Sequence, residues 1–146
     1  MSRWFIPVGL LLVVFSHAAA QPVRDPVLTV QIEELRRVEG LLCLAVFSGE
    51  EGFPDRIDQA RWSQCQEVSD VAMAVSIPIT YGSYAITVFH DENSNGEMDT
   101  GTFGIPKEGF GFSSNPKIRF AQPTYSESRI AFTPDQPQTT VRMRYF

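Results

Sequence analysis

The sequence is poor in the side chains on which many enzymes depend. It contains two histidines and two cysteines, and of the histidines only His90 lies beyond the first twenty residues. No C-x-x-C pair, nucleophile-elbow motif, P-loop or dinucleotide-binding fingerprint is present. Thiol redox chemistry, nucleotide-dependent chemistry and a serine hydrolase of the elbow type therefore have no support in the sequence.

Positive charge is also scarce. The chain has 12 lysines and arginines against 17 aspartates and glutamates, which gives a formal net charge of −5 at pH 7. An acidic surface disfavours nucleic acid and anionic lipid as partners, because their phosphates are repelled. The same surface is compatible with the binding of a cation. Beyond the N-terminal segment, no apolar run is long enough to cross a membrane.

The N-terminal segment has the three parts of a secretory signal peptide. "MSRW" carries one arginine, "FIPVGLLLVVF" is a short apolar stretch, and "SHAAA" ends in small residues before Gln21. We therefore expect residues 1–20 to be a signal peptide that is cleaved near Ala20/Gln21, with export to the periplasm or secretion. An uncleaved anchor is the alternative. Residues 21–146 have the length of a single domain.

The two cysteines, Cys43 and Cys65, are predicted to form a disulfide, because an even pair in an exported chain is usually oxidised. In the chain-entropy account, a bridge that closes a loop of about 22 residues adds about 3 kcal/mol of stability. A pair of free thiols is the alternative.

Apolar and polar residues alternate with the two-residue period of β-strands through much of the chain. Strands are predicted over residues 28–35, 41–47, 71–79, 84–90, 129–133 and 141–146. A helical turn is expected around Ile57 to Trp62, and the long connection 91–127 has no strand pattern before "KIRF" (117–120). Several short strands separated by turns predict an all-β fold, a single antiparallel β-sandwich of about seven strands.

The stretch "HDENSNGEMD" (90–99) carries the pattern D-x-N-x-N-G of calcium-binding loops. Residues with side-chain oxygens stand at positions 1, 3, 5, 7 and 9 of that loop: Asp91, Asn93, Asn95, Glu97 and Asp99. Gly96 at position 6 allows the sharp turn, and the backbone carbonyl of position 7 points toward the ion. We therefore predict a Ca²⁺ site. The alternative is a plain hairpin turn, for which Asn-Gly is a strong signal.

The loop departs from the EF-hand at two points. Position 12, where a bidentate glutamate closes the calcium shell, is Thr102, and a strand instead of a helix leads in. A further ligand must therefore come from Thr102, Glu108 or water. With two carboxylates in the shell, Asp91 and Asp99, we expect a dissociation constant on the order of 10⁻⁴–10⁻³ M, and the mixed oxygen ligands favour calcium over magnesium.

Residues 84–115, "YAITVFHDENSNGEMDTGTFGIPKEGFGFSSN", resemble the signature of the DUF2141 family, in which a strand leads into H-D-E-N-x-N-G-x-x-D and then G-I-P-x-E-G-[YF]-G-F-S-N. An extra Ser114, and "FAQPTY" (120–125) in place of F-G-P-P-[ST]-[FY], are the departures. The resemblance implies an exported bacterial protein of unknown function with a transthyretin-like or Cna-B-like (Ig-like) sandwich. The acidic loop is also similar to calcium loops that stiffen β-domains of bacterial surface proteins.

Two groups of residues near the acidic loop allow two interpretations each. Phe103, Phe110 and Phe112 lie among glycines, and they are either an aromatic platform for a sugar or peptide or rings that cap the sandwich. His90 is either a general base beside Asp91 or a strand-end histidine that hydrogen-bonds the loop, and no second histidine or evident nucleophile accompanies it.

Together these features predict a non-catalytic exported domain whose calcium loop orders the Gly/Phe-rich segment 100–127. The ordered segment is expected to present a surface for a protein or glycan partner. The alternative is a small metal-dependent hydrolase or carbohydrate-acting enzyme that uses His90, Asp91 and Glu108 around a metal. A third hypothesis is a binding module without a metal, built on the aromatic loop.

Overall fold

The computed structural model describes residues 25–119 and 121–146. The predicted signal peptide, residues 1–20, lies outside these ranges. Within them, no helix is long and apolar enough to cross a membrane. Strands make up most of the regular structure, and the helices are short.

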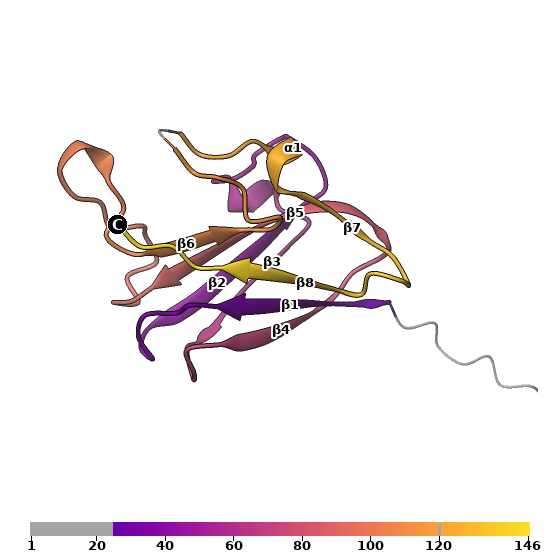
Figure 1. Cartoon of the computed structure of the whole chain (residues 1–146), viewed down its shortest axis with the longest axis horizontal. Helices are drawn as coiled ribbons and strands as arrows, with labels where there is room; N and C mark the ends of the chain where they lie inside the picture. The colour runs from indigo at the N-terminus through magenta and orange to yellow at the C-terminus, as the bar shows by residue number, and fades with distance from the viewer. Residues whose placement is uncertain (1–24, 120) are drawn as a thin grey trace, which may run out of the picture.

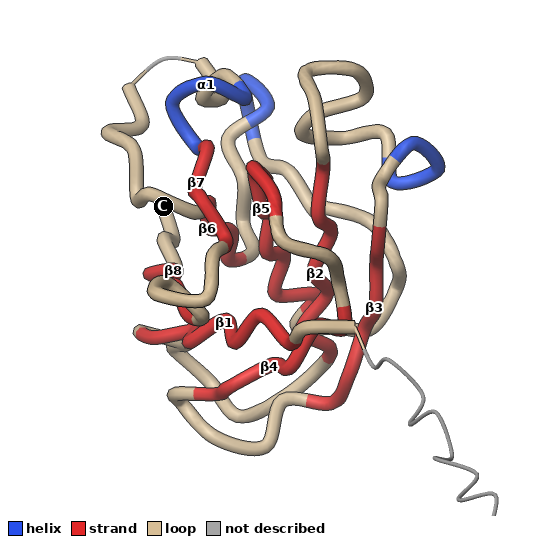
Figure 2. Tube along the Cα trace, turned by 90° about the vertical axis from the view of Figure 1, so that its right-hand side faces the viewer, coloured by secondary structure: helices blue, strands red, loops and turns tan. Residues whose placement is uncertain are grey.

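Two β-sheets form the layers of the molecule (Figures 1 and 2). The smaller sheet has the order β4 (Met73–Pro78), β1 (Val27–Glu33) and β8 (Gln138–Arg142). The larger has the order β3 (Trp62–Glu67), β2 (Leu41–Phe47), β5 (Gly82–Asp91) and β6 (Gly109–Phe112), and β7 (Arg129–Phe132) also pairs with β5. The predicted all-β sandwich is confirmed, with eight strands in the described ranges. Because β1 and β8 pair in parallel, the sandwich is not wholly antiparallel.

The core lies between the two sheets and is built from the inward-facing residues of each strand. On β1 these are Leu28, Val30 and Ile32, each at most 1% exposed. They belong to one cluster with residues of the larger sheet, including Leu42 and Ile86. Burial of each such side chain stabilises the fold by about 1.5–3 kcal/mol. Alternation in the sequence therefore locates these strands correctly.

Strands β3 and β6 do not follow from the sequence pattern. The β3 segment, WSQCQE, is largely exposed and lacks apolar alternation, and it is held at the sheet edge by pairing with β2. The β6 segment, GFGF, has four residues, and its glycines hide the period of two. Both strands form because they hydrogen-bond to neighbouring strands of the sheet. Such pairing leaves no pattern in the local sequence.

Other predicted boundaries are also corrected. Residues 117–119 of "KIRF" form no strand, and the expected turn at Ile57 to Trp62 is a 3₁₀ helix, η1, over Ile57–Gln59 only. The last strand pairs over Gln138–Arg142 instead of 141–146. A helical turn that the sequence pattern did not indicate, α1 (Tyr125–Ser128), is closed by a capping box between Thr124 and Glu127.

Strands β6 and β7 follow one another along the same edge of β5. Residues 87–90 of β5 pair with β6, and residues 82–85 pair with β7. Ile86 lies between the two ladders, and its N–H donates to Ser113 Oγ at 2.8 Å. The Ser113 hydroxyl in turn donates to the carbonyl of Ser128. Ser113 thus gives the Ile86 N–H a hydrogen-bond partner between the two ladders. A buried N–H without a partner would cost about 1–3 kcal/mol.

Cys43 and Cys65 form the predicted disulfide, which joins β2 to β3. The two residues are direct partners in the antiparallel register of these strands. Since β3 is an edge strand with few buried side chains, the disulfide and the ladder together hold it on the sheet.

Candidate functional site

The acidic loop begins where β5 ends and returns to the sheet at β6. Asp91 is the last residue of β5, and residues 92–108 leave the sheet as a hairpin that projects at the left of Figure 1. The two arms are joined by a hydrogen bond from Lys107 N–H to the Asp99 carbonyl at 2.8 Å. The predicted calcium loop and the Gly/Phe-rich residues that follow it are therefore one structural unit.

Inside the loop, side-chain oxygens at the first, third and fifth positions accept backbone N–H groups further along the chain. Asp91 Oδ1 and Oδ2 accept from Asn95 N–H at 3.1 Å and from Gly96 N–H at 2.8 Å. Asn93 Oδ1 also accepts from Asn95 N–H, at 3.2 Å, and Asn95 Oδ1 accepts from Glu97 N–H at 2.9 Å. These bonds curl the backbone around its polar side chains.

Asp99 meets this curl from the far end of the loop. Its Oδ2 accepts from Asn93 Nδ2 at 2.6 Å, and its Oδ1 accepts from Asn95 Nδ2 at 3.2 Å. Three of the predicted ligands thus touch one another. Asp91 is fully buried, Asp99 is half-buried, and the two asparagines and Glu97 are exposed. The loop therefore has an inner carboxylate and an open polar rim.

Glu108 fixes the two ends of the loop to each other. Its side chain is 3% exposed, and its carboxylate oxygens accept the N–H groups of Glu92 and Asp99, both at 2.9 Å. One of the two candidate closing ligands thus ties the entry of the loop to its exit. The other, Thr102, lies in the exposed 3₁₀ helix η2 (Thr102–Gly104) at the outer end of the hairpin (Figure 1).

Gly40, just before β2, lets another segment approach the base of the loop closely. A Cβ at this position would lie 2.1 Å from the Asp91 carbonyl oxygen and 2.7 Å from Glu92 Cα. The backbone of Gly40 also has a φ of +72°, which favours glycine. In the sequence, Gly40 is a lone glycine directly before an apolar strand. No motif connects it to the acidic loop, so the sequence does not predict its place at the site.

His90 is fully buried at the core face of β5. Its Nδ1 accepts from the Tyr145 hydroxyl at 2.8 Å, and its Nε2–H donates to the Glu39 carbonyl at 2.8 Å. Burial raises the pKa of the Tyr145 hydroxyl above its usual value. Of the two interpretations of His90, the geometry supports a histidine that holds the structure by hydrogen bonds.

The three residues of the hydrolase alternative are all buried. His90 and Asp91 are 0% exposed and Glu108 is 3% exposed. The polar atoms of each side chain bond to other groups of the chain. General acid–base catalysis requires a group within hydrogen-bonding reach of the substrate. Catalysis by these residues would therefore require that a substrate displace hydrogen bonds within the chain.

Arg36, in the segment after β1, covers this network from outside. Its Nε and one terminal nitrogen donate to the Glu92 carboxylate at 2.7 Å and 2.6 Å, and the same terminal nitrogen donates to the Lys107 carbonyl at 2.8 Å. The guanidinium carbon lies 4.5 Å from the centroid of the Tyr145 ring, a cation–π contact. The hydrogen bond from Arg36 lowers the pKa of Glu92 below its usual value.

A Glu92→Gln substitution is expected to lower the free energy of unfolding at neutral pH by about 1 kcal/mol, since Arg36 is 35% exposed and solvent screens the pair. The folded-state pKa of Glu92 is lowered, so the stabilisation is present above the unfolded-state pKa of about 4.3 and is lost as pH falls through the lower folded-state pKa. Urea unfolding from about pH 7 to about pH 3 measures this. If the free energy of unfolding of the variant differs from that of wild type by the same amount over that whole range, the Arg36–Glu92 pair is not the cause. Glu67→Gln, which changes an exposed carboxylate, is the control.

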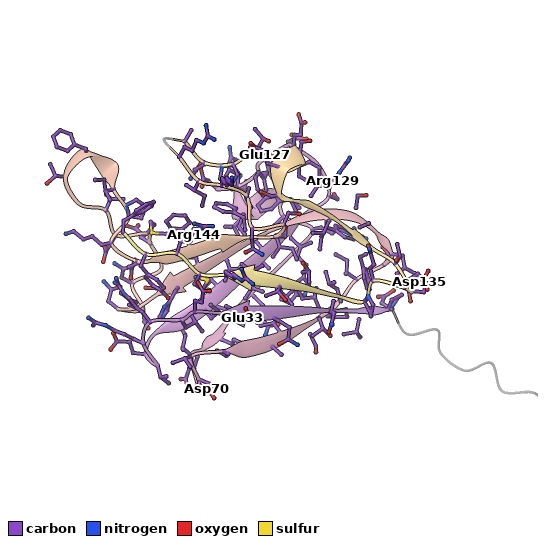
Figure 3. All side chains as sticks on the ribbon, viewed as in Figure 1. Glu33, Asp70, Glu127, Arg129, Asp135 and Arg144 are labelled. Atoms are coloured by element: carbon purple, nitrogen blue, oxygen red, sulfur yellow. A yellow bond between two sulfur atoms is a disulfide. The ribbon has the colours of Figure 1, made fainter. Side chains whose placement is uncertain are left out.

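The "GFGF" of β6 turns its glycines toward the core and its phenylalanines away from it. A Cβ on Gly109 would lie 2.3 Å from the Tyr145 ring, and one on Gly111 would also overlap a core side chain. The missing side chains allow the C-terminal segment to pack directly on β6. There, Phe110 N–H donates to the Arg144 carbonyl at 3.1 Å and Arg144 N–H donates back at 2.8 Å (Figure 3, Arg144).

The three phenylalanines of the aromatic loop lie in different surroundings. Phe112 is 7% exposed and lies with its ring centroid 6.1 Å from that of Phe53. Phe110 is half-buried and faces Phe146, with ring centroids 5.7 Å apart. Phe103 is 96% exposed and has a φ of 62°. Phe112 is therefore covered on the outer face of the larger sheet, whereas Phe103 and Phe110 remain on the surface.

Several residues that hold this region are missed by sequence reasoning. Asn115 donates from Nδ2 to the Thr140 carbonyl at 2.8 Å and accepts at Oδ1 from Arg142 N–H at 2.8 Å, which fixes the turn after β6 to β8. Arg36 and Tyr145 are likewise far from the loop in the chain. Their partners are brought near only by the fold, so no local pattern in the sequence indicates them.

The described ranges contain no group of three or more His, Cys, Asp or Glu side chains placed to hold a metal. A calcium site at this loop would have two carboxylates, Asp91 and Asp99. Its other oxygens would come from asparagine side chains and the backbone, which are ordinary calcium ligands.

The comparison with protein families gives one match. Residues 30–141 match the family described as "Uncharacterized protein conserved in bacteria (DUF2141)", and the chain belongs to this family. The resemblance carried by residues 84–115 is thereby confirmed and extends over both sheets. Searches of curated proteins and of solved structures gave no match.

Proposed function

We propose that this protein is an exported, non-catalytic β-sandwich domain that binds Ca²⁺ at its acidic loop and uses the ion to order the hairpin 92–108. The observation that carries the proposal is the convergence of side chains at loop positions 1, 3, 5 and 9: Asp91, Asn93, Asn95 and Asp99. Glu97 would add its backbone carbonyl, and Glu108, Thr102 or water would complete the shell. The ordered hairpin would then present a binding surface.

The charge balance of the loop supports a cation. Within the described ranges, neither Asp91 nor Asp99 forms a salt bridge with a lysine or arginine. Asp91 is nevertheless fully buried, and a buried carboxylate is costly unless it is paired or binds a metal. The N–H groups of Asn95 and Gly96 offset part of that cost. A divalent cation would supply the missing positive charge, and the open rim gives it a path to the loop.

Export is supported by the disulfide between Cys43 and Cys65, since disulfides persist in oxidising compartments. Extracellular and periplasmic compartments are also where weak calcium sites are used, because calcium is abundant outside the cytosol. A site with a dissociation constant on the order of 10⁻⁴–10⁻³ M suits such a compartment.

The direct test is a calcium titration by isothermal calorimetry. The protein is expected to bind one Ca²⁺ with a dissociation constant on the order of 10⁻⁴–10⁻³ M. Asp99→Asn removes one charge at the half-buried end of the loop and is expected to weaken binding about tenfold or more. Glu97→Gln, which keeps the backbone carbonyl, should bind nearly as wild type. Absence of any heat up to about 10 mM calcium would rule out a site of this affinity class.

A further inference from the structure

The outer face of the larger sheet is divided into a covered half and an open half. In the covered half, Phe47 and Phe112 are buried beside Phe53 of the loop after β2, with ring centroids 5.5 Å and 6.1 Å from it. That loop lies above the sheet in Figure 1. In the open half, Phe89 of β5 and its register partner Phe110 of β6 are only half-buried. Aromatic surface is therefore left uncovered on one half of the sheet.

An open groove of about 860 Å³ lies over this second half. Its floor includes Phe89 and Phe110. One side is formed by residues 54, 55 and 57 and by residues 118, 119 and 121–123. The other side is formed by apolar residues of the hairpin: Met98, Phe103 and Ile105. The groove has the size of a small-molecule site, and most of its lining is apolar.

Few charged side chains line the groove. The lining contains one carboxylate, Asp55, and one cation, Arg119. Gln122 Nε2 donates to Asp55 Oδ1 at 3.1 Å, so the carboxylate already has a partner. Arg119 is exposed and forms no salt bridge in the part of the chain that the structure describes. The groove thus offers an apolar floor, and the Arg119 guanidinium at its edge is not paired with a carboxylate among the described residues.

We propose that this groove binds a fatty carboxylate, with its apolar chain on Phe89 and Phe110 and its carboxylate at Arg119. An apolar chain loses contact with water on the aromatic floor, and a guanidinium recognises a carboxylate by paired hydrogen bonds. A sugar fits less well, because its hydroxyls need many hydrogen-bonding groups and the polar lining side chains are few. A cationic amphiphile would meet Arg119 and one carboxylate, Asp55, which already accepts a hydrogen bond from Gln122.

Phe103 also favours an occupant of the groove. It is 96% exposed, although a fully exposed phenylalanine ring contributes nothing to the core. Because Phe103 and Ile105 line the groove from the hairpin side, a bound chain would cover part of their surface. The floor and the opposite side are formed by the sheet and by residues outside the acidic loop. The inference therefore goes beyond the calcium proposal, although one side of the groove is the hairpin that calcium would order.

The experiment is a calorimetric titration of the purified protein with sodium decanoate and, separately, with decyltrimethylammonium, both in EDTA and in calcium. Decanoate is expected to bind with a dissociation constant on the order of 10⁻⁴ M, and the cation is expected to bind at least tenfold more weakly. Arg119→Gln should weaken decanoate binding about fivefold. Arg129→Gln, an exposed cation outside the groove near α1 (Figure 3), should leave it unchanged.

Two further variants test the apolar part of the groove without opening the core. Phe146, which is 67% exposed, and Phe103 both line the groove, so Phe146→Ala and Phe103→Ser should each weaken decanoate binding while the protein stays folded. No binding of decanoate, or equal binding of the cation, overturns the proposal. Dimerisation of the protein at rising concentration that Phe103→Ser abolishes would assign the groove to a second copy of the chain and would also overturn it. Because calcium binding is measured separately, either proposal can fail alone.

Discussion

Glu108→Ala is expected to lower the free energy of unfolding by about 4 kcal/mol. The substitution removes a buried carboxylate that accepts the N–H groups of Glu92 and Asp99. Hydrogen bonds to a charged acceptor contribute about 1.5–3 kcal/mol each, and both donors would lose their partner. The entry and exit of the acidic loop would then no longer be joined by this side chain. Urea unfolding followed by tryptophan fluorescence measures the change.

Two variants separate this bond pair from general effects of charge. Glu108→Gln keeps the shape and one acceptor oxygen but turns an amide N–H₂ toward the second donor, so about half of the loss is expected. Glu97→Ala removes an exposed carboxylate of the same loop and should change stability by less than about 0.5 kcal/mol. If Glu108→Ala unfolds within about 1 kcal/mol of wild type, the carboxylate does not hold the loop.

Gly109→Ala is expected to cost about 3 kcal/mol. The new Cβ would lie 2.3 Å from the Tyr145 ring, so the ring must move. Overpacking of this kind typically costs about 1–3 kcal/mol. Displacement of Tyr145 also removes the hydrogen bond to the fully buried His90 Nδ1, and an unsatisfied buried acceptor adds about 1–3 kcal/mol.

Gly49→Ala is the matched control for this prediction. A Cβ at Gly49 meets nothing within 4 Å. The change should therefore alter stability by less than about 0.5 kcal/mol. A second check uses Tyr145→Phe in the Gly109→Ala background. Both changes break the same Tyr145–His90 hydrogen bond. The double variant should therefore be destabilised by less than the sum of the two single changes. Full additivity would show that the ring does not move as expected.

The strands that face the core on alternate residues follow from the sequence, whereas the others do not. On β1, the buried residues are Leu28, Val30 and Ile32, which alternate with polar residues. This period of two indicates a strand with one buried face. β3 has no such face, and its place depends on β2 and on the Cys43–Cys65 bridge. A ladder and a covalent bond to a distant segment leave no local period in the sequence.

The candidate site divides in the same way. Its local part, the spacing of Asp91, Asn93 and Asn95, is a pattern of chain neighbours, and the structure places those side chains together. Its long-range part, Arg36 and Tyr145, comes from opposite ends of the chain and meets the loop only after folding. The sequence does not predict the groove over β5 and β6 either. The groove arises because the loop after β2 covers one half of the outer face of the sheet and leaves the other half open.

The calcium proposal is tested most directly by thermal unfolding of the protein in EDTA, in about 10 mM Ca²⁺ and in about 10 mM Mg²⁺. With a dissociation constant near 10⁻⁴ M, calcium would stabilise the folded state by about 2.7 kcal/mol. For a domain of this size the melting temperature should rise on the order of 10 °C in calcium, with a much smaller rise in magnesium. Equal melting temperatures in all three solutions would contradict a calcium site in the acidic loop.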